Sequence, residues 1–523
     1  MRRKLLNGKR AGTLAVILVL FMSVGVAEEE RTDAGGQWTY VLEDGGARIT
    51  GHAAQLSGEL IIPGELDGHP VTTVGFAAFE LCGGLTGVTF PDSVTRIGDS
   101  AFWGCGLTGI TVPDGETSIG KNPFAYCALT RIEVSPANLA YAQRDGVLFD
   151  KWMQSLLAYP AAREGAYSIP EGVLHIGSAA FEGCGGLTAV TIPDSVTLLG
   201  DEAFLNCTGL SAVTIPESIT HIGSHAFDGC GGLSGVIIPN RVTSIGDCAF
   251  YNCVSLSSLA IPDSVTDIGF YAFAGCGLTD LTIPAGVPYI DTGVFYLCGS
   301  LLRVVLPDSV TGIGDYAFYQ CKELNAVNIP DGVTTIGAFA FAGCSKLAGL
   351  AVPASVAAIG VSAFADCGSL TLTVAEGSFA EQYAKENSIP YVTETEKPED
   401  GGAENLQSYD MGGDMIPSFN AVVGERRITD AGSGSSRVSG VRQMTYTYET
   451  QSRDEDVEAY FSALRTAGFL VTKDLAGGAL KGSVQLGIAS AEEGKIIVLD
   501  LSWDDAEVSV VLTKGEGTIT PNR

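Results

Sequence analysis

The sequence predicts a repeat solenoid built of parallel β coils with short helical turns, followed by a small C-terminal α+β domain. Cysteine recurs at steps of 22 or 23 residues along most of the chain, and a similar pattern of apolar residues surrounds each one. A repeat of this length indicates coils that stack in one direction, each contacting only its neighbours. The cysteines at this spacing are Cys82, Cys105, Cys127, Cys184, Cys207, Cys230, Cys253, Cys276, Cys298, Cys321, Cys344 and Cys367.

One coil, residues 210–230, shows how the repeat folds. Residues 213–215 alternate inward and outward and end at Pro216, which cannot donate to a β ladder, so they predict a short strand. Residues 219–222 predict a second strand, and residues 226–230 a tight helical turn that closes the coil. The phenylalanines of this turn should stack into a buried spine: Phe102, Phe124, Phe181, Phe204, Phe227, Phe250, Phe273, Phe295, Phe318, Phe341 and Phe364.

Other segments flank or interrupt the repeats. Basic residues, an apolar run over residues 11–22 and small residues at 25–27 are typical of a secretory signal peptide. Two short strands across a turn after Val134 predict a projecting hairpin. The predicted parts are a signal peptide (1–27), an N-terminal lid hairpin (28–59), the solenoid (60–377) with the hairpin insert at about 135–168, a C-terminal cap (378–392), an acidic linker (393–405) and the small α+β domain (406–523).

The C-terminal domain differs in pattern from the repeats. Ser452 and Glu455 form a capping box, and the helix that they begin should end at Gly468. Strands are expected on both sides of this helix, which together make an α+β module. The expected strands are residues 444–449, 483–489, 495–503 and 507–513.

The repeat consensus is Leu-x-x-Val-x-Ile-Pro-x-x-Val-x-x-Ile-Gly-x-x-Ala-Phe-x-x-Cys, and it closely resembles the BspA-like leucine-rich repeat family. The resemblance covers roughly residues 38–392, including the lid, the insert around residues 145–149 and the C-terminal cap. It implies leucine-rich-repeat-type coils in a secreted or surface-displayed, mostly bacterial protein that binds host proteins or other cells. The family pattern has no catalytic residue to carry over, and the C-terminal domain lies outside the resemblance.

Composition narrows the classes of partner. The net charge is −30, from 30 Lys and Arg against 60 Asp and Glu. Nucleic acids and anionic membranes attract basic surfaces, so we expect neither as a partner. No apolar run after the signal peptide is long enough for a membrane helix, so no membrane span is expected after its removal.

Several columns of the repeat suggest chemistry that packing explains better. The cysteines could form disulfides or a metal array, but a column that recurs in every coil favours unpaired core thiols. Gly115 and Lys121 have the spacing of a phosphate loop, but Asn122 stands where Ser or Thr is needed. His175 and His221 lie two coils apart, too far to share one metal ion. The recurring Asp residues would suit calcium binding, and the recurring Thr residues would suit ice binding. Turn chemistry already explains the Asp residues, and the β-propensity of exposed strand positions explains the Thr residues. We therefore expect no metal and no cofactor.

Two candidate sites remain. Cys248 lies off the cysteine column, and an exposed thiol there would be the possible reactive thiol. Aromatic residues also gather at variable, outward positions of adjacent coils, and exposed aromatics are typical of binding surfaces. This candidate ligand-binding patch comprises Tyr251, Phe270, Tyr271, Tyr289, Tyr296, Tyr316 and Tyr319.

These observations predict a secreted or cell-surface protein that is not an enzyme and that mediates protein–protein interaction or adhesion. Its partner would be a protein or a cell-surface ligand, with a host-derived ligand as one candidate. No recurring catalytic constellation stands out, so we expect no catalytic residues. One alternative is a secreted enzyme with its activity in residues 406–523 and the solenoid as a targeting arm. Another is a structural surface rod.

Overall fold

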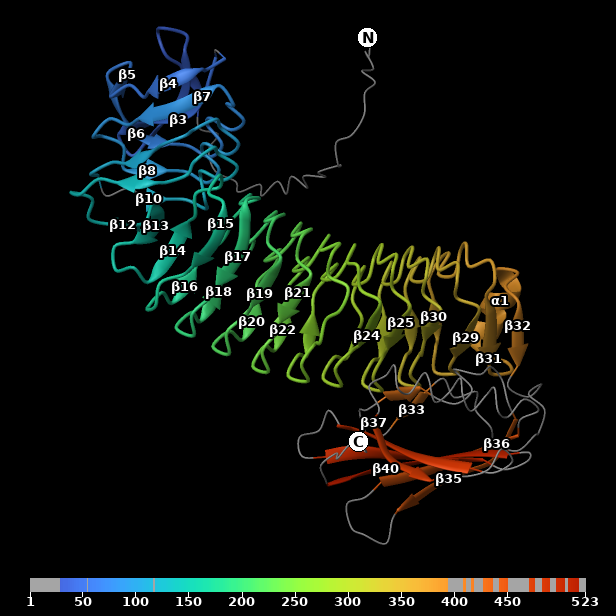
Figure 1. Ribbon diagram of the computed structural model, residues 1–523. Helices are drawn as coiled ribbons and strands as arrows, with labels where there is room; N and C mark the ends of the chain where they lie inside the picture. The colour runs from blue at the N-terminus through green and yellow to red at the C-terminus, as the bar shows by residue number, and fades with distance from the viewer. Residues whose placement is uncertain are drawn as a thin grey trace. The chain divides into compact units, whose positions relative to one another are not determined.

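The computed structural model describes residues 29–53, 55–115 and 118–393 in full, and eight strands between Ser408 and Glu516. The chain forms two compact units, Met1–Glu396 and Lys397–Arg523. The first unit is a parallel β-solenoid whose coils follow one another in chain order (Figure 1). This architecture confirms the fold class that the repeat predicts.

Most coils place a first strand before the proline and a second strand after it, and each kind pairs in parallel with its equivalent in the next coil. In the first ladder, Val190 pairs with Val213 and Val213 with Val236. The first strands are β4 (Gly58–Ile61), β7 (Leu85–Thr89), β9 (Thr111–Val112), β11 (Glu133–Val134), β15 (Gly165–Ser168), β17 (Leu187–Thr191), β19 (Ala212–Thr214), β21 (Gly235–Ile237), β24 (Asp280–Thr282), β25 (Arg303–Val305), β27 (Ala326–Val327), β29 (Gly349–Val352), β31 (Thr371–Val374) and β32 (Tyr391–Thr393).

Most of the second strands have two residues, and glycine follows nearly all of them and begins the turn. In this ladder, Ile222 pairs with Ile245 and Ile245 with Ile268. The second strands are β6 (His69–Val74), β8 (Arg96–Ile97), β10 (Ser118–Ile119), β14 (Ser155–Ala158), β16 (His175–Ile176), β18 (Leu198–Leu199), β20 (His221–Ile222), β22 (Ser244–Ile245), β23 (Asp267–Ile268), β26 (Gly312–Ile313), β28 (Thr335–Ile336) and β30 (Ala358–Ile359).

The segment that closes each coil, which we call the turn segment, is a series of hydrogen-bonded turns. Alternate N–H groups stay within the coil or reach the next one: Cys207 donates to Phe204 O (3.2 Å), whereas Phe204 donates to Ala226 O (2.8 Å). Glu202 and Asn206 have positive φ, 58° and 57°. A continuous helix cannot form with such residues, so the turns are helical only locally.

The phenylalanine rings of the turn segments stack through the core. The rings of Phe204 and Phe227, for example, lie 5.3 Å apart and 2° from parallel. Both ends of the spine are covered. Trp38 packs edge-on and His52 stacks on the first ring, Phe79, and Tyr383 packs edge-on against the last, Phe364.

The cysteine column lies beside this spine. All thirteen cysteines are free thiols, and ten of them are buried. From Cys105 onward, each column thiol donates to the carbonyl of the phenylalanine, or of Tyr159, in the preceding coil; Cys230 Sγ lies 3.1 Å from Phe204 O. Burial raises the pKa of Cys105 and Cys127 to about 12. The column is therefore a packing position that also satisfies a buried carbonyl.

The insert joins the core and does not project. Strands β12 (Tyr141–Arg144) and β13 (Val147–Asp150) pair antiparallel, and β13 also pairs antiparallel with β14. The side chains of Val147, Leu148 and Phe149 are fully buried, and successive residues contribute to two different hydrophobic clusters. The predicted projection was wrong because this run is apolar on both faces, which indicates a strand covered on both sides. Tyr159 then takes the spine position, 5.0 Å from Phe181.

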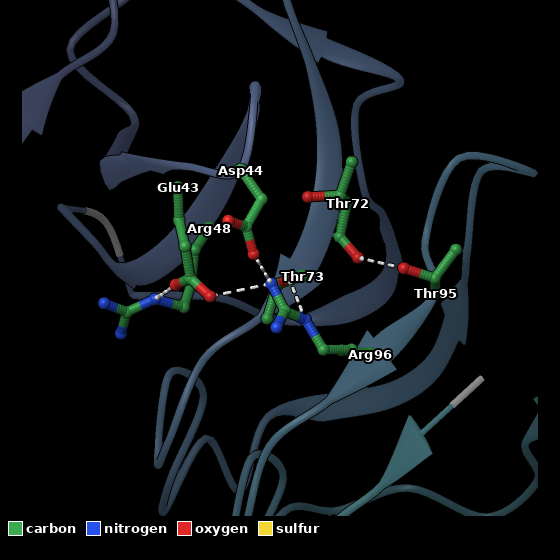
Figure 2. A network of polar contacts seen from close by, with 7 residues as sticks. All are labelled: Glu43, Asp44, Arg48, Thr72, Thr73, Thr95 and Arg96. Atoms are coloured by element: carbon green, nitrogen blue, oxygen red, sulfur yellow. Dashed lines mark hydrogen bonds and ion pairs between the residues drawn. The ribbon is translucent and has the colours of Figure 1, made fainter.

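An antiparallel hairpin covers the first coil. It comprises β2 (Trp38–Glu43) and β3 (Gly46–His52), with β1 (Arg31–Thr32) paired to β2; β5 (Glu65–Leu66) pairs instead with β6 of the first coil. Figure 2 shows how it is tied to the solenoid: Glu43 accepts from Arg96 Nη2 of β8 (2.7 Å) and, within the hairpin, from Arg48 Nε (2.6 Å). Arg96 also donates to Thr73 Oγ1 at 3.1 Å. The cap is thus joined to the coils by ionic contacts as well as by its apolar face.

The other end is covered by helix α1 (Phe379–Glu386), the single helix among the described residues. Ser378 caps its N-terminus by accepting from Glu381 N, and the Tyr383 hydroxyl accepts from Ala363 N (3.1 Å). No helix in the described part of the chain is long and apolar enough to cross a membrane.

The second unit contains two antiparallel sheets. The larger has the order β35-β36-β40-β39-β38-β37. The predicted strands of this unit are present, whereas the helix expected between Ser452 and Gly468 lies outside the described residues. The strands are β33 (Ser408–Asp410), β34 (Met415–Pro417), β35 (Arg427–Ser435), β36 (Arg442–Glu449), β37 (Leu470–Leu475), β38 (Gly482–Ala489), β39 (Lys495–Trp503) and β40 (Glu507–Glu516).

Candidate functional site

The turn segments form one long face of the solenoid, which we call the turn face. Two positions point outward in most segments: the second residue after the glycine, and the residue after the phenylalanine. In the turn segment that begins at Gly223, these positions hold His225 and Asp228. Because the coils stack in register, side chains at equivalent positions lie next to one another along this face.

Five aromatic side chains at these positions touch in an unbroken series. Tyr271 and Tyr296 meet edge-on at 5.7 Å, and Tyr296 stacks on Tyr319 at 5.1 Å. Tyr316 contacts Tyr319 at 5.6 Å and stacks on Phe339 at 5.2 Å. All five are partly exposed. We call this set, Tyr271, Tyr296, Tyr316, Tyr319 and Phe339, the aromatic cluster.

A glycine makes room for the first ring of the cluster. Gly293 occupies the position equivalent to Tyr271 in the next coil and has a φ of 65°. A Cβ atom there would lie 2.2 Å from Cε1 of Tyr271, so the tyrosine ring lies over the bare backbone. This arrangement lets Tyr271 reach across one coil to Tyr296.

The structure brings together four of the seven predicted patch residues and adds Phe339, which sequence reasoning missed. Tyr251 shares a column with Tyr296, but Ala274 lies between them. Phe270 (48% exposed) lies at the preceding position of its turn segment, where its N–H donates to an aspartate. Phe339 could have been found from its spacing of 23 residues after Tyr316.

Tyr289 belongs to another part of the surface. It directly precedes Ile290, which bridges to Ile313 in the second-strand ladder. Its ring fills the space where Gly312 lacks a Cβ, and the side chain is 38% exposed. Tyr289 is therefore a natural reference residue for experiments on the cluster.

Two groups in or near the cluster have raised pKa values. Burial raises the pKa of Tyr271, and the charges of neighbouring tyrosines add to the effect. Burial and then the charges of Asp267 and Asp247 raise the pKa of Asp291, which itself acts on Tyr289, outside the cluster. The partly exposed rings of the cluster thus offer apolar faces and phenolic hydroxyls.

Cys248 is half-buried on the same face. It occupies the position of His225 one coil later and that of Tyr271 one coil earlier. The thiol therefore lies between an imidazole and the first ring of the aromatic cluster.

The first-strand side carries two open grooves. One, of about 480 Å³, is lined by residues in and next to β7, β9 and β11, among them Arg131 and Glu133. The other, of about 560 Å³, lies between β21 and residues 258–260, where the first ladder is interrupted. Ile237 borders it and is 64% exposed. Among the described residues, no group of three or more His, Cys, Asp or Glu side chains is placed to hold a metal ion.

Comparison with known families decides what the coils are. Residues 72–145, 166–279 and 266–384 match the BspA type leucine-rich repeat region, in six copies. These ranges cover more than half of the 523 residues. The chain belongs to this family. The match includes all the coils that carry the aromatic cluster. It ends before the second compact unit.

Several solved structures are similar to this BspA-type chain. A leucine-rich cell surface protein from Faecalibacterium prausnitzii A2-165 is 25% identical, covering 70% of this chain and 95% of its own, with a TM-score of 0.38. A leucine-rich repeat protein from Bacteroides ovatus ATCC 8483 is 25% identical, covering 68% and 98%, with a TM-score of 0.35. The pneumococcal vaccine antigen PcpA is 19% identical, covering 65% and 68%, with a TM-score of 0.33. No curated protein matches the chain.

Proposed function

We propose that this BspA-type protein is secreted or displayed on a cell surface, is not an enzyme, and binds a protein or cell-surface ligand through the aromatic cluster. The observation that carries the proposal is the unbroken series of contacts between partly exposed rings from Tyr271 to Phe339. Secretion rests on the signal-peptide pattern of residues 1–27.

Exposed tyrosines suit recognition for a physical reason. A tyrosine offers a large apolar face with a polar tip, and it has few rotatable bonds to freeze on binding. In the cluster, each ring is already held by a neighbour, so binding would order little that is not ordered in the free protein. A surface of this kind can bury apolar area at a small entropic cost.

The outward positions vary between coils, whereas the inward ones recur. The leucine, phenylalanine and cysteine positions are buried in nearly every coil and serve packing. The outward positions of the turn face hold His225 and Asp228 in one coil and Tyr316 and Tyr319 in another. Recognition of a particular partner therefore belongs to these outward residues, and the solenoid supplies a rigid support for them.

The test is a comparison of binding by two variants of the full-length mature protein. Candidate host proteins, cells and glycans are first screened with the wild type. The double variant Tyr296→Ala/Tyr319→Ala should then bind the captured partner at least tenfold more weakly, because aromatic anchors each contribute about 2 kcal/mol or more. Tyr289→Ala, which removes a more exposed ring outside the cluster, should bind like the wild type.

Two results would contradict the proposal. If the double variant binds as tightly as Tyr289→Ala, the aromatic cluster is not the binding site. If the wild type binds none of the candidate proteins, cells or glycans, the adhesive function itself is wrong. Thermal unfolding of both variants serves as the control, because surface rings should leave the midpoint nearly unchanged.

A further inference from the structure

A histidine, an aspartate and a cysteine meet on the turn face beside the aromatic cluster. His225 and Cys248 hold the same position in consecutive coils, because the strands that precede them, β20 and β22, pair in register. Both have φ in the left-handed region, 54° and 52°. The N–H of His225 donates to the carbonyl of Asp247, the residue before Cys248, at 2.7 Å. Equivalent backbone positions of paired strands lie about 4.8 Å apart, so these side chains are neighbours.

Asp228 holds the histidine ring from the other side. Its Oδ2 lies 2.9 Å from His225 Nδ1, so Nε2 is the ring nitrogen that Asp228 does not contact. The hydrogen bond with Asp228 and then the contact with Cys248 raise the pKa of His225 to about 10. A carboxylate in this relation orients an imidazole and stabilises its protonated form. The His225 side chain is 41% exposed, so solutes can reach the group.

We propose that Cys248 is a nucleophilic thiol that the His225–Asp228 pair activates for exchange with a disulfide. The proposal does not depend on the binding function assigned to the aromatic cluster. The ligand is defined by its chemistry: a solvent-accessible disulfide, whether in a small molecule or at the surface of a protein.

The exchange needs no other reagent. His225 is already protonated at neutral pH, so the proton of Cys248 passes to the solvent and the imidazolium stabilises the thiolate. The thiolate sulfur attacks one sulfur of the disulfide, and a new S–S bond forms to Cys248 as the original S–S bond breaks. The leaving thiolate takes a proton from the solvent, so one disulfide is replaced by another and no oxidant is consumed.

The remaining partly exposed thiols have different surroundings. Cys82 Sγ lies 3.1 Å from His52 Nε2, but burial raises the pKa of this thiol. Burial likewise raises the pKa of Cys367 to about 11. Since the thiolate is the reactive form, both should exchange slowly at neutral pH. Cys248 is the partly exposed thiol that lies beside an imidazole paired with a carboxylate.

The test treats the folded full-length protein with glutathione disulfide at neutral pH and follows each modified cysteine by peptide mass spectrometry. Cys248 should form the glutathione adduct first. His225→Gln should slow this reaction about tenfold or more, because a cysteine beside a protonated imidazole carries a larger thiolate fraction. Asp228→Asn should slow it in the same direction. His221→Gln, which changes an exposed histidine of the same coil, should leave the rate unchanged.

A spectroscopic measurement separates activation from a change of structure. The ultraviolet absorbance of the thiolate, taken as wild type minus Cys248→Ser at neutral pH, should disappear in the His225→Gln background. The proposal is overturned if Cys248 forms no adduct in the wild type. It is also overturned if both His225→Gln and Asp228→Asn react within about twofold of the wild type.

Discussion

Raising the pH above the ordinary range of a cysteine thiol should unfold the solenoid. Five core thiols have a pKa well above the usual value of cysteine: Cys207, Cys230, Cys253, Cys298 and Cys321. The main cause is contact with a neighbouring thiol, followed by burial, for Cys230 and Cys253, and it is burial for the other three. Folded thiols therefore stay protonated where the unfolded chain has lost its protons, above about pH 8.5. The stability is fully present below that pH and falls as the pH rises, because the folded state binds more protons.

The expected magnitude is large. Each such thiol lowers the free energy of unfolding by about 1.4 kcal/mol per pH unit, so these five alone give about 7 kcal/mol per unit, and other column thiols with a raised pKa, such as Cys105 and Cys127, add to this slope. From about pH 8.5 to about pH 10, the loss reaches about 10 kcal/mol, which is comparable with the total stability of a typical domain. Circular dichroism in the presence of a reductant should therefore show the strand signal disappear near about pH 10 and return on neutralisation.

A single substitution provides the matched control. Cys253→Ala removes one of the five thiols, so its free energy of unfolding should fall less steeply with pH, by about 1.4 kcal/mol per unit, although the variant is less stable at neutral pH. The reasoning is refuted if the free energy of unfolding of the wild type stays level between about pH 8 and about pH 10.5.

Three further predictions concern the spine, the cluster and the cap. Phe227→Ala should lower the free energy of unfolding by about 3 to 5 kcal/mol in chemical denaturation, because the ring is fully buried; Phe270→Ala, at an exposed ring, should cost less than about 1 kcal/mol, and equal costs would contradict the spine. Gly293→Ala should displace the Tyr271 ring and cost about 1 to 2 kcal/mol, seen as altered tyrosine fluorescence; an unchanged spectrum would contradict the close contact. Glu43→Gln should cost about 1 kcal/mol and raise hydrogen exchange in the N-terminal hairpin, whereas unchanged exchange would show that the ion pairs do not hold it.

Much of the solenoid could be predicted from the sequence, because each inward position recurs with the coil. The phenylalanine and cysteine columns, which contain Phe227 and Cys230, determine the repeat length. The repeat length in turn determines which residues become neighbours. Tyr159 was missed because the coil inside the insert is shortened and carries no cysteine at the expected step. The turn segment was expected to be helical, but its alternate N–H groups bond to the next coil, and spacing along one chain does not reveal such bonds.

The candidate sites were less predictable, because outward positions follow no consensus. Tyr289 and Tyr296 are equally aromatic in the sequence, yet one precedes the second strand and the other follows the spine phenylalanine, which places them on different parts of the coil. The pairing of His225 with Cys248 had a signal, a separation of 23 residues, but Asp228 gains its meaning only once the ring orientation is known.

The central claim, that recognition occurs on the turn face, is tested most directly by tyrosine footprinting of the partner-bound protein. The full-length protein, alone and with its captured partner, is treated with a tyrosine-selective reagent, and modification is measured for each residue. We expect binding to protect Tyr296 and Tyr319 and to leave Tyr289 equally modified in both states. Protection of Tyr289 alone, or of tyrosines in the second compact unit with none in the cluster, would contradict the claim.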